Sequence, residues 1–263
     1  MHLPSLSFSS FVLLALSLGL GTAACSVNLG DKTQGDKGTM SFSYDGPGCA
    51  FGCGLERSAL QGSLVTVNAT GGDANVAQTA RISETSIARV SQQHESCTCD
   101  TSSGNTSTST SVDPGATCAS GATKSCSLSA DIETSAEGDA HLEVVDASGA
   151  LIDSVTVHVR PAARIDVTVG ATAVKDASPI TARVGDKVKL ETHAFDANGD
   201  ETIFTKHGIS HDYGDATVLG PDDSVLIGST NVEDMIAKAP GDTTVSVHAP
   251  GAEQLVRFHV VAP

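Results

Sequence analysis

Residues 239–249 read APGDTTVSVHA, and this stretch decides the fold. From Val245 onward its apolar residues occupy every second position, which is the period of a β-strand with one buried face. The Gly-Asp pair before the strand is typical of a tight turn. The same pattern begins at Gly138, where the sequence reads GDAHLEV. The sequence therefore predicts two matching antiparallel strands, one in each half of the chain.

Two further pairs of segments extend this match. Residues 62–67 (GSLVTV) correspond to 185–190 (GDKVKL), and 155–159 (VTVHV) correspond to 256–260 (VRFHV). Repetition of this kind indicates tandem homologous domains, and no stretch beyond the N-terminal segment keeps a helical period. We therefore predict an all-β chain with two tandem β-sandwiches, one over residues 41–162 and one over 163–263.

The composition fits such a chain and excludes one class of partner. The chain is 40% hydrophobic but only 3% aromatic, so its cores must consist mainly of Val, Ile, Leu and Ala. The formal charge is −16 and the pI is near 4.7. Both halves share the acidic excess, with −9 over residues 25–162 and −7 over 163–263. Nucleic acid is excluded as a partner because phosphate binding needs a basic surface.

The second half carries a family resemblance. Residues 184–199 (VGDKVKLETHAFDANG), then 239–249, then the last strand over 254–261, resemble the bacterial immunoglobulin-like domains (group 2) of intimins, invasins and other surface proteins. The resemblance covers 163–263 well and 40–162 less well. It implies immunoglobulin-like sandwiches that serve adhesion, recognition or spacing. Antibody-type domains are excluded, because the chain has no Trp to pack on an inter-sheet disulfide.

The N-terminus has the pattern of an export signal. Residues 11–20 (FVLLALSLGL) form an apolar block that small residues follow, up to Cys25. The block is far shorter than the ~20 apolar residues that a bilayer span needs, so we predict a cleaved signal peptide over residues 1–24. Ordinary signal-peptidase cleavage after Ala24 would suit these small residues.

The same residues also resemble the lipobox of bacterial lipoproteins, although Thr22 stands where that family usually has Leu. The resemblance implies that Cys25 carries lipid and anchors the chain in a membrane of the cell envelope. Because Ser26 follows the cysteine, it further implies delivery to the outer membrane. Residues 25–40 are polar and rich in Gly, and we predict a flexible tether there.

The cysteines support export. Seven cysteines is an odd number, and assigning Cys25 to lipid leaves an even set of six. In an oxidising compartment we expect three disulfides, with Cys97 and Cys99 bonded to different partners. The connectivity is otherwise open. Zinc is the alternative, but the spacings do not match the usual C-x2-C pairs. The six are Cys49, Cys53, Cys97, Cys99, Cys118 and Cys126.

Residues 92–126 form an insertion in the first domain that has no counterpart in the second. The insertion is rich in Ser, Thr and Gly and contains four of the six cysteines. Because it has almost nothing to bury, we predict a long surface loop, stapled to the domain through Cys49 and Cys53. Such a loop is either an interaction surface or a stabilising decoration, and the sequence leaves both open.

Two constellations are candidates for metal binding. His207 and His211 lie near Asp212 and Asp215, although loop spacing does not place them on one face. Residues 196–201 (DANGDE) resemble a calcium loop but lack its Gly and bidentate Glu, so a hairpin turn is the better interpretation. The remaining strand histidines are expected to face solvent: His141, His158, His248 and His259.

No nucleophile-elbow, zincin, phosphate-loop or dinucleotide-binding motif is present in the sequence. We therefore predict no enzyme and no cofactor. The first hypothesis is a non-catalytic cell-envelope lipoprotein for adhesion, recognition or spacing, whose protein or carbohydrate ligand the sequence does not name. The alternative is a calcium- or metal-dependent binding module, with carbohydrate as one candidate ligand.

Overall fold

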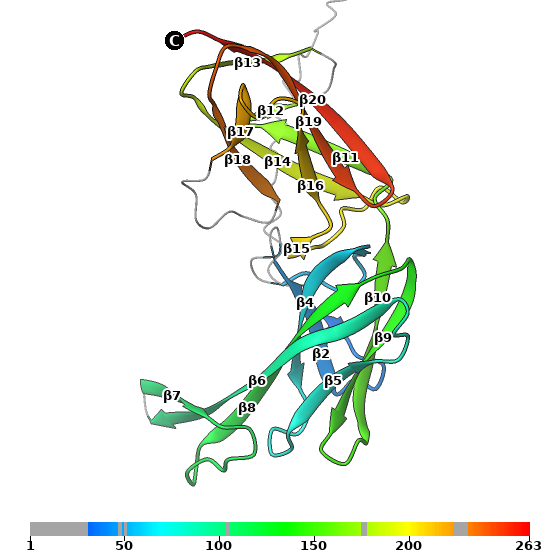
Figure 1. Ribbon diagram of the computed structural model, residues 1–263. Helices are drawn as coiled ribbons and strands as arrows, with labels where there is room; N and C mark the ends of the chain where they lie inside the picture. The colour runs from blue at the N-terminus through cyan, green and yellow to red at the C-terminus, as the bar shows by residue number, and fades with distance from the viewer. Residues whose placement is uncertain (1–30, 47–48, 50–51, 104–105, 175–177, 223–230) are drawn as a thin grey trace, which may run out of the picture.

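The computed structural model describes residues 31–46, 49, 52–103, 106–174, 178–222 and 231–263. The described residues form twenty strands and no helix, so the predicted all-β class is confirmed. Figure 1 shows two β-sandwiches stacked end to end along the chain. The predicted signal peptide and Cys25 lie outside the described residues.

The first domain consists of two sheets. The larger has the order β1-β2-β4-β8-β6-β7, and β15 of the second domain adds to β4. Its strands are β1 (Thr33–Gln34), β2 (Met40–Asp45), β4 (Ser63–Gly71), β6 (Ala88–Ser103), β7 (Thr106–Val112) and β8 (Thr123–Thr134). The smaller sheet has the order β3-β10-β9-β5, with β3 (Ala59–Leu60), β5 (Gln78–Ile82), β9 (Gly138–Asp146) and β10 (Leu151–Arg160).

The second domain repeats this plan. One sheet has the order β12-β11-β14-β18-β17 and the other β13-β20-β19-β16. The first sheet consists of β11 (Arg164–Val169), β12 (Thr172–Ala173), β14 (Lys187–Phe195), β17 (Leu219–Pro221) and β18 (Val232–Ala237). The second sheet consists of β13 (Ile180–Arg183), β16 (Ser210–Tyr213), β19 (Gly241–Ala249) and β20 (Ala252–Val261), while β15 is Lys206–His207.

The strand order identifies both sandwiches as immunoglobulin-like. In each domain the opening strand pairs within one sheet, and a short parallel segment then joins the last strand of the other sheet. These parallel pairs are β3 with β10 and β13 with β20. Without these parallel segments and the two-residue strands β1 and β12, the second domain has four strands in one sheet and three in the other, as in the seven-strand immunoglobulin sandwich. The first domain has the same set with β7 in addition. Alternate residues fill each core, for example Val65 and Val67 on β4 and Val245 and Val247 on β19.

The repeated Gly-Asp turns have a common steric cause. Gly138 and Gly241 each have a φ of 152°, where a side chain is strained. A Cβ on Gly138 would lie 2.6 Å from Cδ1 of Ile87, and one on Gly241 would lie 3.1 Å from Cγ2 of Val218. Glycine is therefore required where the chain enters β9 and β19, which explains the sequence match between the two halves.

Part of the predicted tether is folded. Thr33 and Gln34 pair with β2, and the following turn lies against Asp153 of β10. The fully buried Asp153 carboxylate accepts hydrogen bonds from the backbone N–H groups of Lys37, Thr39 and Met40. Burial alone would raise the pKa of Asp153, but the hydrogen bonds lower it below its usual value. Residues 33–40 thus belong to the first domain, because the buried Asp153 carboxylate holds the turn through backbone donors and Met40 packs in the core.

The two domains share an interface built by strand addition. The segment after β14 runs along the first domain, where Ile203 N–H donates to Ser58 and Thr205 N–H donates to Leu64. β15 then pairs antiparallel with β4. A buried cluster lies beneath this segment: Leu60, Ala162, Ala194 and Phe204. Backbone hydrogen bonds and a shared apolar cluster therefore hold the two sandwiches together as one stem.

An ion-pair chain borders the same interface. Arg57 of the first domain contacts Glu201 of the second at 3.0 Å, and Glu201 also contacts Nδ1 of His193 at 2.5 Å. The hydrogen bond that His193 donates to Glu201 raises the pKa of His193 above its usual 6.5, and the same bond lowers the pKa of Glu201 below its usual 4.5. Between these two usual values both groups are therefore mainly charged.

This charge state predicts a pH window for the interface. Amide exchange at Ile203 and Thr205 should be slowest between pH 4.5 and 6.5, after correction for intrinsic exchange. Below the window Glu201 becomes protonated, and above it His193 loses its proton, so protection falls on both sides. Glu201→Gln should flatten this profile, while the exposed neighbour variant Asp200→Asn should retain it. An identical profile in Glu201→Gln would exclude the ion pair as the cause.

Candidate functional site

The candidate site is an arm that extends from the first domain. β6 is 16 residues long and β8 is 12, far beyond the usual five or six. Their first paired residues lie within the sandwich, and from the Cys97–Cys126 pair outward they leave it and gain β7 as a third strand. We name residues 97–126 the arm. Figure 1 shows it projecting from the sandwich, with β7 at its outer edge.

The prediction of a loop over residues 92–126 is wrong for most of this stretch. Residues 92–103, 106–112 and 123–126 are strand. Low apolar content excluded a packed core, but a sheet also forms through its backbone ladder. Thr is a good strand former, and a Ser/Thr alternation suits a sheet with both faces polar. Among the described residues of this stretch, 113–122 connect β7 to β8 without joining the sheet.

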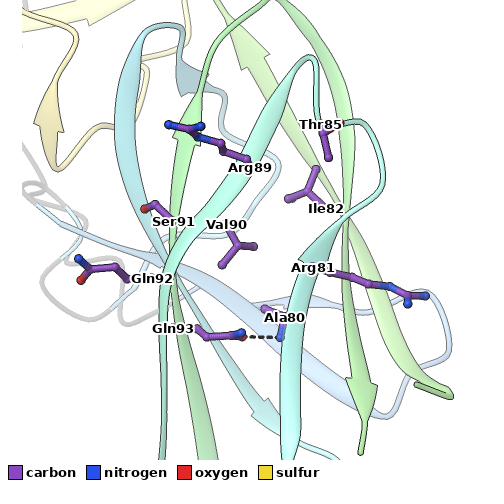
Figure 2. A pocket seen from close by; sticks show the side chains of 9 residues that line it. All are labelled: Ala80, Arg81, Ile82, Thr85, Arg89, Val90, Ser91, Gln92 and Gln93. Carbon is purple, nitrogen blue, oxygen red and sulfur yellow. Dashed lines mark hydrogen bonds between the residues drawn. The ribbon is translucent and has the colours of Figure 1, made fainter. Parts of the chain in front are cut away.

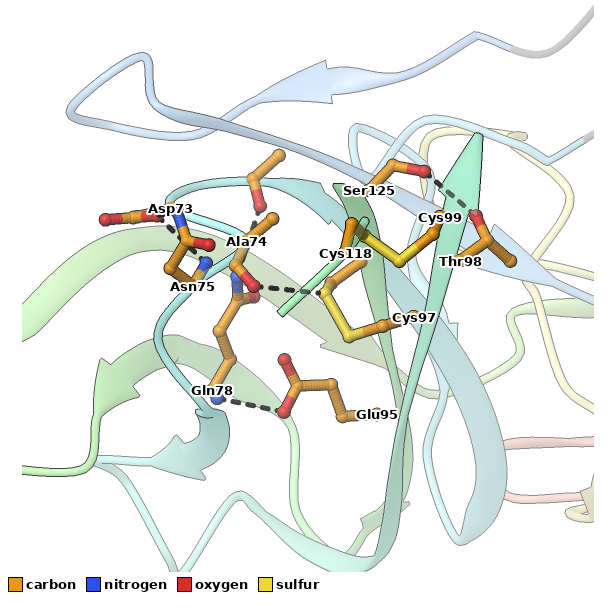
Figure 3. Close-up of a disulfide and its surroundings, with 12 residues drawn as sticks. Asp73, Ala74, Asn75, Gln78, Glu95, Cys97, Thr98, Cys99, Cys118 and Ser125 are labelled. Carbon is orange, nitrogen blue, oxygen red and sulfur yellow. Dashed lines mark hydrogen bonds between the residues drawn. A yellow bond between two sulfur atoms is a disulfide. The ribbon is translucent and has the colours of Figure 1, made fainter. Parts of the chain in front are cut away.

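Two disulfides fix the arm. Cys97 and Cys126 are direct cross-strand partners on β6 and β8, and they are bonded to each other. Cys99 is bonded to Cys118, which ties the 113–122 connection to β6. Cys97 and Cys99 thus have different partners. Figure 3 shows the sulfur atoms of these residues lying together at the root of the arm.

The third disulfide lies elsewhere. Cys49 is bonded to Cys53, next to the end of β2. The arm is therefore not stapled to Cys49 and Cys53, contrary to the sequence prediction. The reason is geometric. The β6–β8 ladder places Cys97 opposite Cys126 within the arm, so the cysteines of the arm bond to each other.

Side chains of β6 hold the root of the arm against β5. Gln93 Oε1 accepts a hydrogen bond from the Ala80 N–H at 2.6 Å, as Figure 2 shows. Glu95 Oε2 accepts one from the Gln78 N–H at 3.1 Å, which is visible in Figure 3. The two side chains thus satisfy the N–H groups on the open edge of β5, where no further strand pairs with it. The open groove beside them has Ile82 and Val90 on its floor.

The arm has two different faces. Cys97, Cys99 and Cys126 are buried on one face, where Cys99 is bonded to Cys118 and the sulfur of Cys126 lies 3.5 Å from the carbonyl oxygen of Ala74. Strand alternation places hydroxyls on the opposite face, which we name the hydroxyl face. Its members with described side chains are Thr98 and Asp100 on β6, Ser109 and Ser111 on β7, and Thr123 and Ser125 on β8.

Hydrogen bonds organise the hydroxyl face around one carboxylate. Ser109 donates to Asp100 at 2.5 Å, and Ser125 donates to it at 3.4 Å. Thr98 and Ser125 are also 3.1 Å apart across β6 and β8. The face therefore offers many small donors and acceptors around a single charge. This chemistry suits recognition through hydrogen bonds.

The predicted calcium segment forms a hairpin turn. Asp196 Oδ1 accepts the N–H groups of Asn198 and Asp200, and Oδ2 accepts the hydroxyl of Ser58 from the other domain. Asp196 is 4% exposed, so its oxygens are committed to the turn and the interface. This is the Asx-turn chemistry that the Asn-Gly sequence indicates.

The structure does not bring the predicted pair His207 and His211 together as ligands. His207 is exposed on β15, where it pairs with Ser63 of β4. His211 lies on β16, with Nδ1 at 3.7 Å from Glu233, and burial lowers its pKa. Among the described residues, the group with metal-ligand geometry is instead Glu95, Cys97 and Cys126, whose sulfurs are bonded to each other.

The strand histidines face the surface, and each lies beside a carboxylate. His158 Nδ1 is 2.9 Å from Asp139, and His259 Nδ1 is 2.6 Å from Asp242. These two pairs occupy equivalent positions on the last two strands of the two domains. Sequence reasoning missed them, although the Asp of each Gly-Asp turn and the alternating His of the next strand were both visible. His141 pairs likewise with Glu84 and His248 with Asp212.

No family model matches this chain, and no curated protein matches it in sequence. It is similar in structure to the Escherichia coli adhesin FdeC, at 14% identity and a TM-score of 0.31 over 88% of this chain and 66% of that one. It is also similar to the Yersinia pseudotuberculosis adhesin InvE, at 14% identity and a TM-score of 0.28 over 86% of this chain and 61% of that one. A third similar structure comprises domains 4 and 5 of the S-layer protein SbsC, at 20% identity and a TM-score of 0.28 over 50% of this chain and 69% of that one. This chain thus spans less than two thirds of the FdeC and InvE chains. Within its own described residues, no helix is long and apolar enough to span a bilayer.

The disulfides should order the arm without determining the stability of the sandwich. In a Cys97→Ala/Cys126→Ala variant, amide exchange over residues 98–125 should accelerate at least about tenfold, because the ladder there loses its cross-link. The melting temperature of the sandwich should change little. In the matched control Cys49→Ala/Cys53→Ala, arm exchange should stay at the wild-type rate. Unchanged arm exchange in the first variant would show that the Cys97–Cys126 bond is not needed to order the arm.

Proposed function

We propose that this chain is a non-catalytic cell-envelope lipoprotein that acts in adhesion or recognition through its arm. One observation carries the proposal, namely the extension of β6 and β8 beyond the sandwich as a cross-linked three-stranded sheet. A polar extension without a core costs conformational entropy, and disulfides reduce that cost. Exposed elements on rigid scaffolds commonly carry binding.

The stem supports this function mechanically. Strand addition by β15 and the buried Phe204 cluster oppose bending between the sandwiches. A ligand held by the arm would therefore be held at a fixed position relative to the second domain. A spacer alone would need the stem but not the hydroxyl face. We therefore favour adhesion or recognition over spacing.

The anchor is the second component of the proposal. A lipid on Cys25 would tether the chain through residues 26–32, since β1 begins at Thr33. Eight residue steps span at most roughly 28 Å. The first domain would thus stay close to the membrane, which suits a bacterial immunoglobulin-like surface protein of the intimin and invasin type. The proposal includes no metal, because Asp196 already serves the hairpin turn.

Removing the arm tests the proposal. Replacing residues 99–124 by Asn-Gly keeps the Cys97–Cys126 pair and closes β6 and β8 at the Thr98–Ser125 pair as a short hairpin. On whole cells, this variant should lose most attachment to host cells, matrix proteins or glycan arrays that the wild-type chain binds. Export and the melting temperature should be retained. The matched control is Leu255→Ala, which alters an exposed apolar residue on the second domain and should bind normally.

Two outcomes would contradict this account. Equal attachment by the armless variant would assign binding to the stem. Unaltered membrane retention of Cys25→Ser would exclude the lipid anchor, because removal of the lipidated cysteine should release the chain into the soluble fraction.

A further inference from the structure

β7 is an unusual edge strand. It is the outermost strand at one edge of its sheet and has seven residues. The other edge strands of the four sheets have two to five residues. Its sequence, TSTSTSV, contains no charged residue and no Pro. Residues 108–111 are exposed. Charged residues, Pro and shortness are the usual devices that keep edge strands from pairing with another chain, and β7 has none of them.

The register shows which backbone groups are free. Ser103 and Thr106 are paired across the two-residue connection, so this pair exchanges hydrogen bonds as in other two-residue hairpins. Hydrogen-bonded pairs recur at every second position. The N–H and C=O groups of Thr108 and Thr110 therefore point toward β6, and those of Ser109 and Ser111 point outward.

The disulfide supports this register. If Cys97 bonds to β7 through its backbone, then it forms a non-hydrogen-bonded pair with Cys126 on β8. Such pairs have Cα atoms about 4.5 Å apart, against about 5.5 Å for hydrogen-bonded pairs. The Cα atoms of Cys97 and Cys126 are 4.1 Å apart. The outward direction of the Ser109 N–H thus follows from two independent features of the arm.

Another edge of the same domain is protected. The outward N–H groups of Gln78 and Ala80 on β5 are bonded to the side chains of Glu95 and Gln93. Among the described side chains, none accepts a hydrogen bond from the N–H groups of Ser109 and Ser111 on β7. The domain thus caps one edge and leaves the longer edge open.

We propose that β7 pairs antiparallel with β7 of a second copy of this chain, with Ser109 at the two-fold axis. The strand is self-complementary about that residue. Thr108 then lies opposite Thr110 of the other copy. The three strands of each arm form one six-stranded sheet, and the two hydroxyl faces lie on the same side of it. This inference rests on the proposed function of the arm as the contact element.

Charge limits where two copies of this chain can meet. A net charge of −16 makes two copies repel over most of their surface. β7 is uncharged and lies at the outer edge of the arm, so pairing there brings the backbones together while the two bodies stay apart. Homotypic pairing of acidic chains should therefore strengthen as salt screens the repulsion. A basic partner would show the opposite dependence on salt.

The test is sedimentation equilibrium of the full mature chain with Cys25→Ser, which removes the lipid. We expect a reversible monomer–dimer equilibrium whose Kd falls when NaCl rises from roughly 50 to 500 mM. Ser109→Pro removes the outward N–H without breaking a backbone hydrogen bond to β6, and it should raise the Kd about tenfold or more. The matched control Ser109→Ala loses the same hydroxyl bond to Asp100 but keeps that N–H, and it should dimerise like the wild type. Native disulfide mapping confirms that each variant retains the arm.

Two results would overturn the proposal. One is a monomer up to about 1 mM at every salt concentration. The other is a dimer that Ser109→Pro and Ser109→Ala affect equally, since its contact would then lie elsewhere. Neither result affects the attachment test, because an arm that stays monomeric can still bind a different ligand on cells. Loss of self-pairing and loss of the proposed adhesive function are thus distinguishable.

Discussion

The continuous ladder between β6 and β8 is the interaction on which the arm depends. Its inner half lies over the apolar core, where Ala88 on β6 and Leu128, Ala130 and Ile132 on β8 are buried. Its outer half has no core beneath it, only disulfides and hydroxyls. The stable inner half therefore sets the register and direction of the outer half. The register shift between Val90 and Gln92 lies within the inner half.

The stem formed by the two sandwiches fixes the position of the arm relative to the second domain. If the sandwiches moved independently, an arm fixed to one of them would not be fixed relative to the other. The segment from Glu201 to His207 prevents this by combining an ion pair, backbone bonds and a shared apolar cluster. Each component is modest alone, and their combination along Arg57, β3 and the start of β4 resists both bending and twisting.

The sequence predicted the features that follow from apolar periodicity. Alternating Val and Leu residues located most core strands, and matched Gly-Asp turns revealed the tandem domains. Both turns reflect a local steric requirement that Gly138 and Gly241 meet in the same way. The cysteine count indicated three pairs but not their connectivity, which depends on the β6–β8 register.

What the sequence did not reveal depends on backbone pairing and long-range contacts. A Ser/Thr-rich stretch is predicted to be a loop when strands are recognised by alternating apolar residues. The backbone ladder of the arm has no such alternation. Thr33 to Met40 looked like tether for the same reason, because the partner that holds it, Asp153, lies more than a hundred residues away. The pairing of Arg57 with Glu201 likewise requires the packed domains.

The central claim is that the arm keeps a fixed orientation on a rigid stem. Its most direct test is a spin-label distance measurement between exposed Thr123 on the arm and exposed Glu253 on the second domain, in dilute solution. Our account predicts a single narrow distance distribution that persists after the temperature is raised toward the melting range. A broad or multimodal distribution in the native, fully disulfide-bonded chain would contradict it.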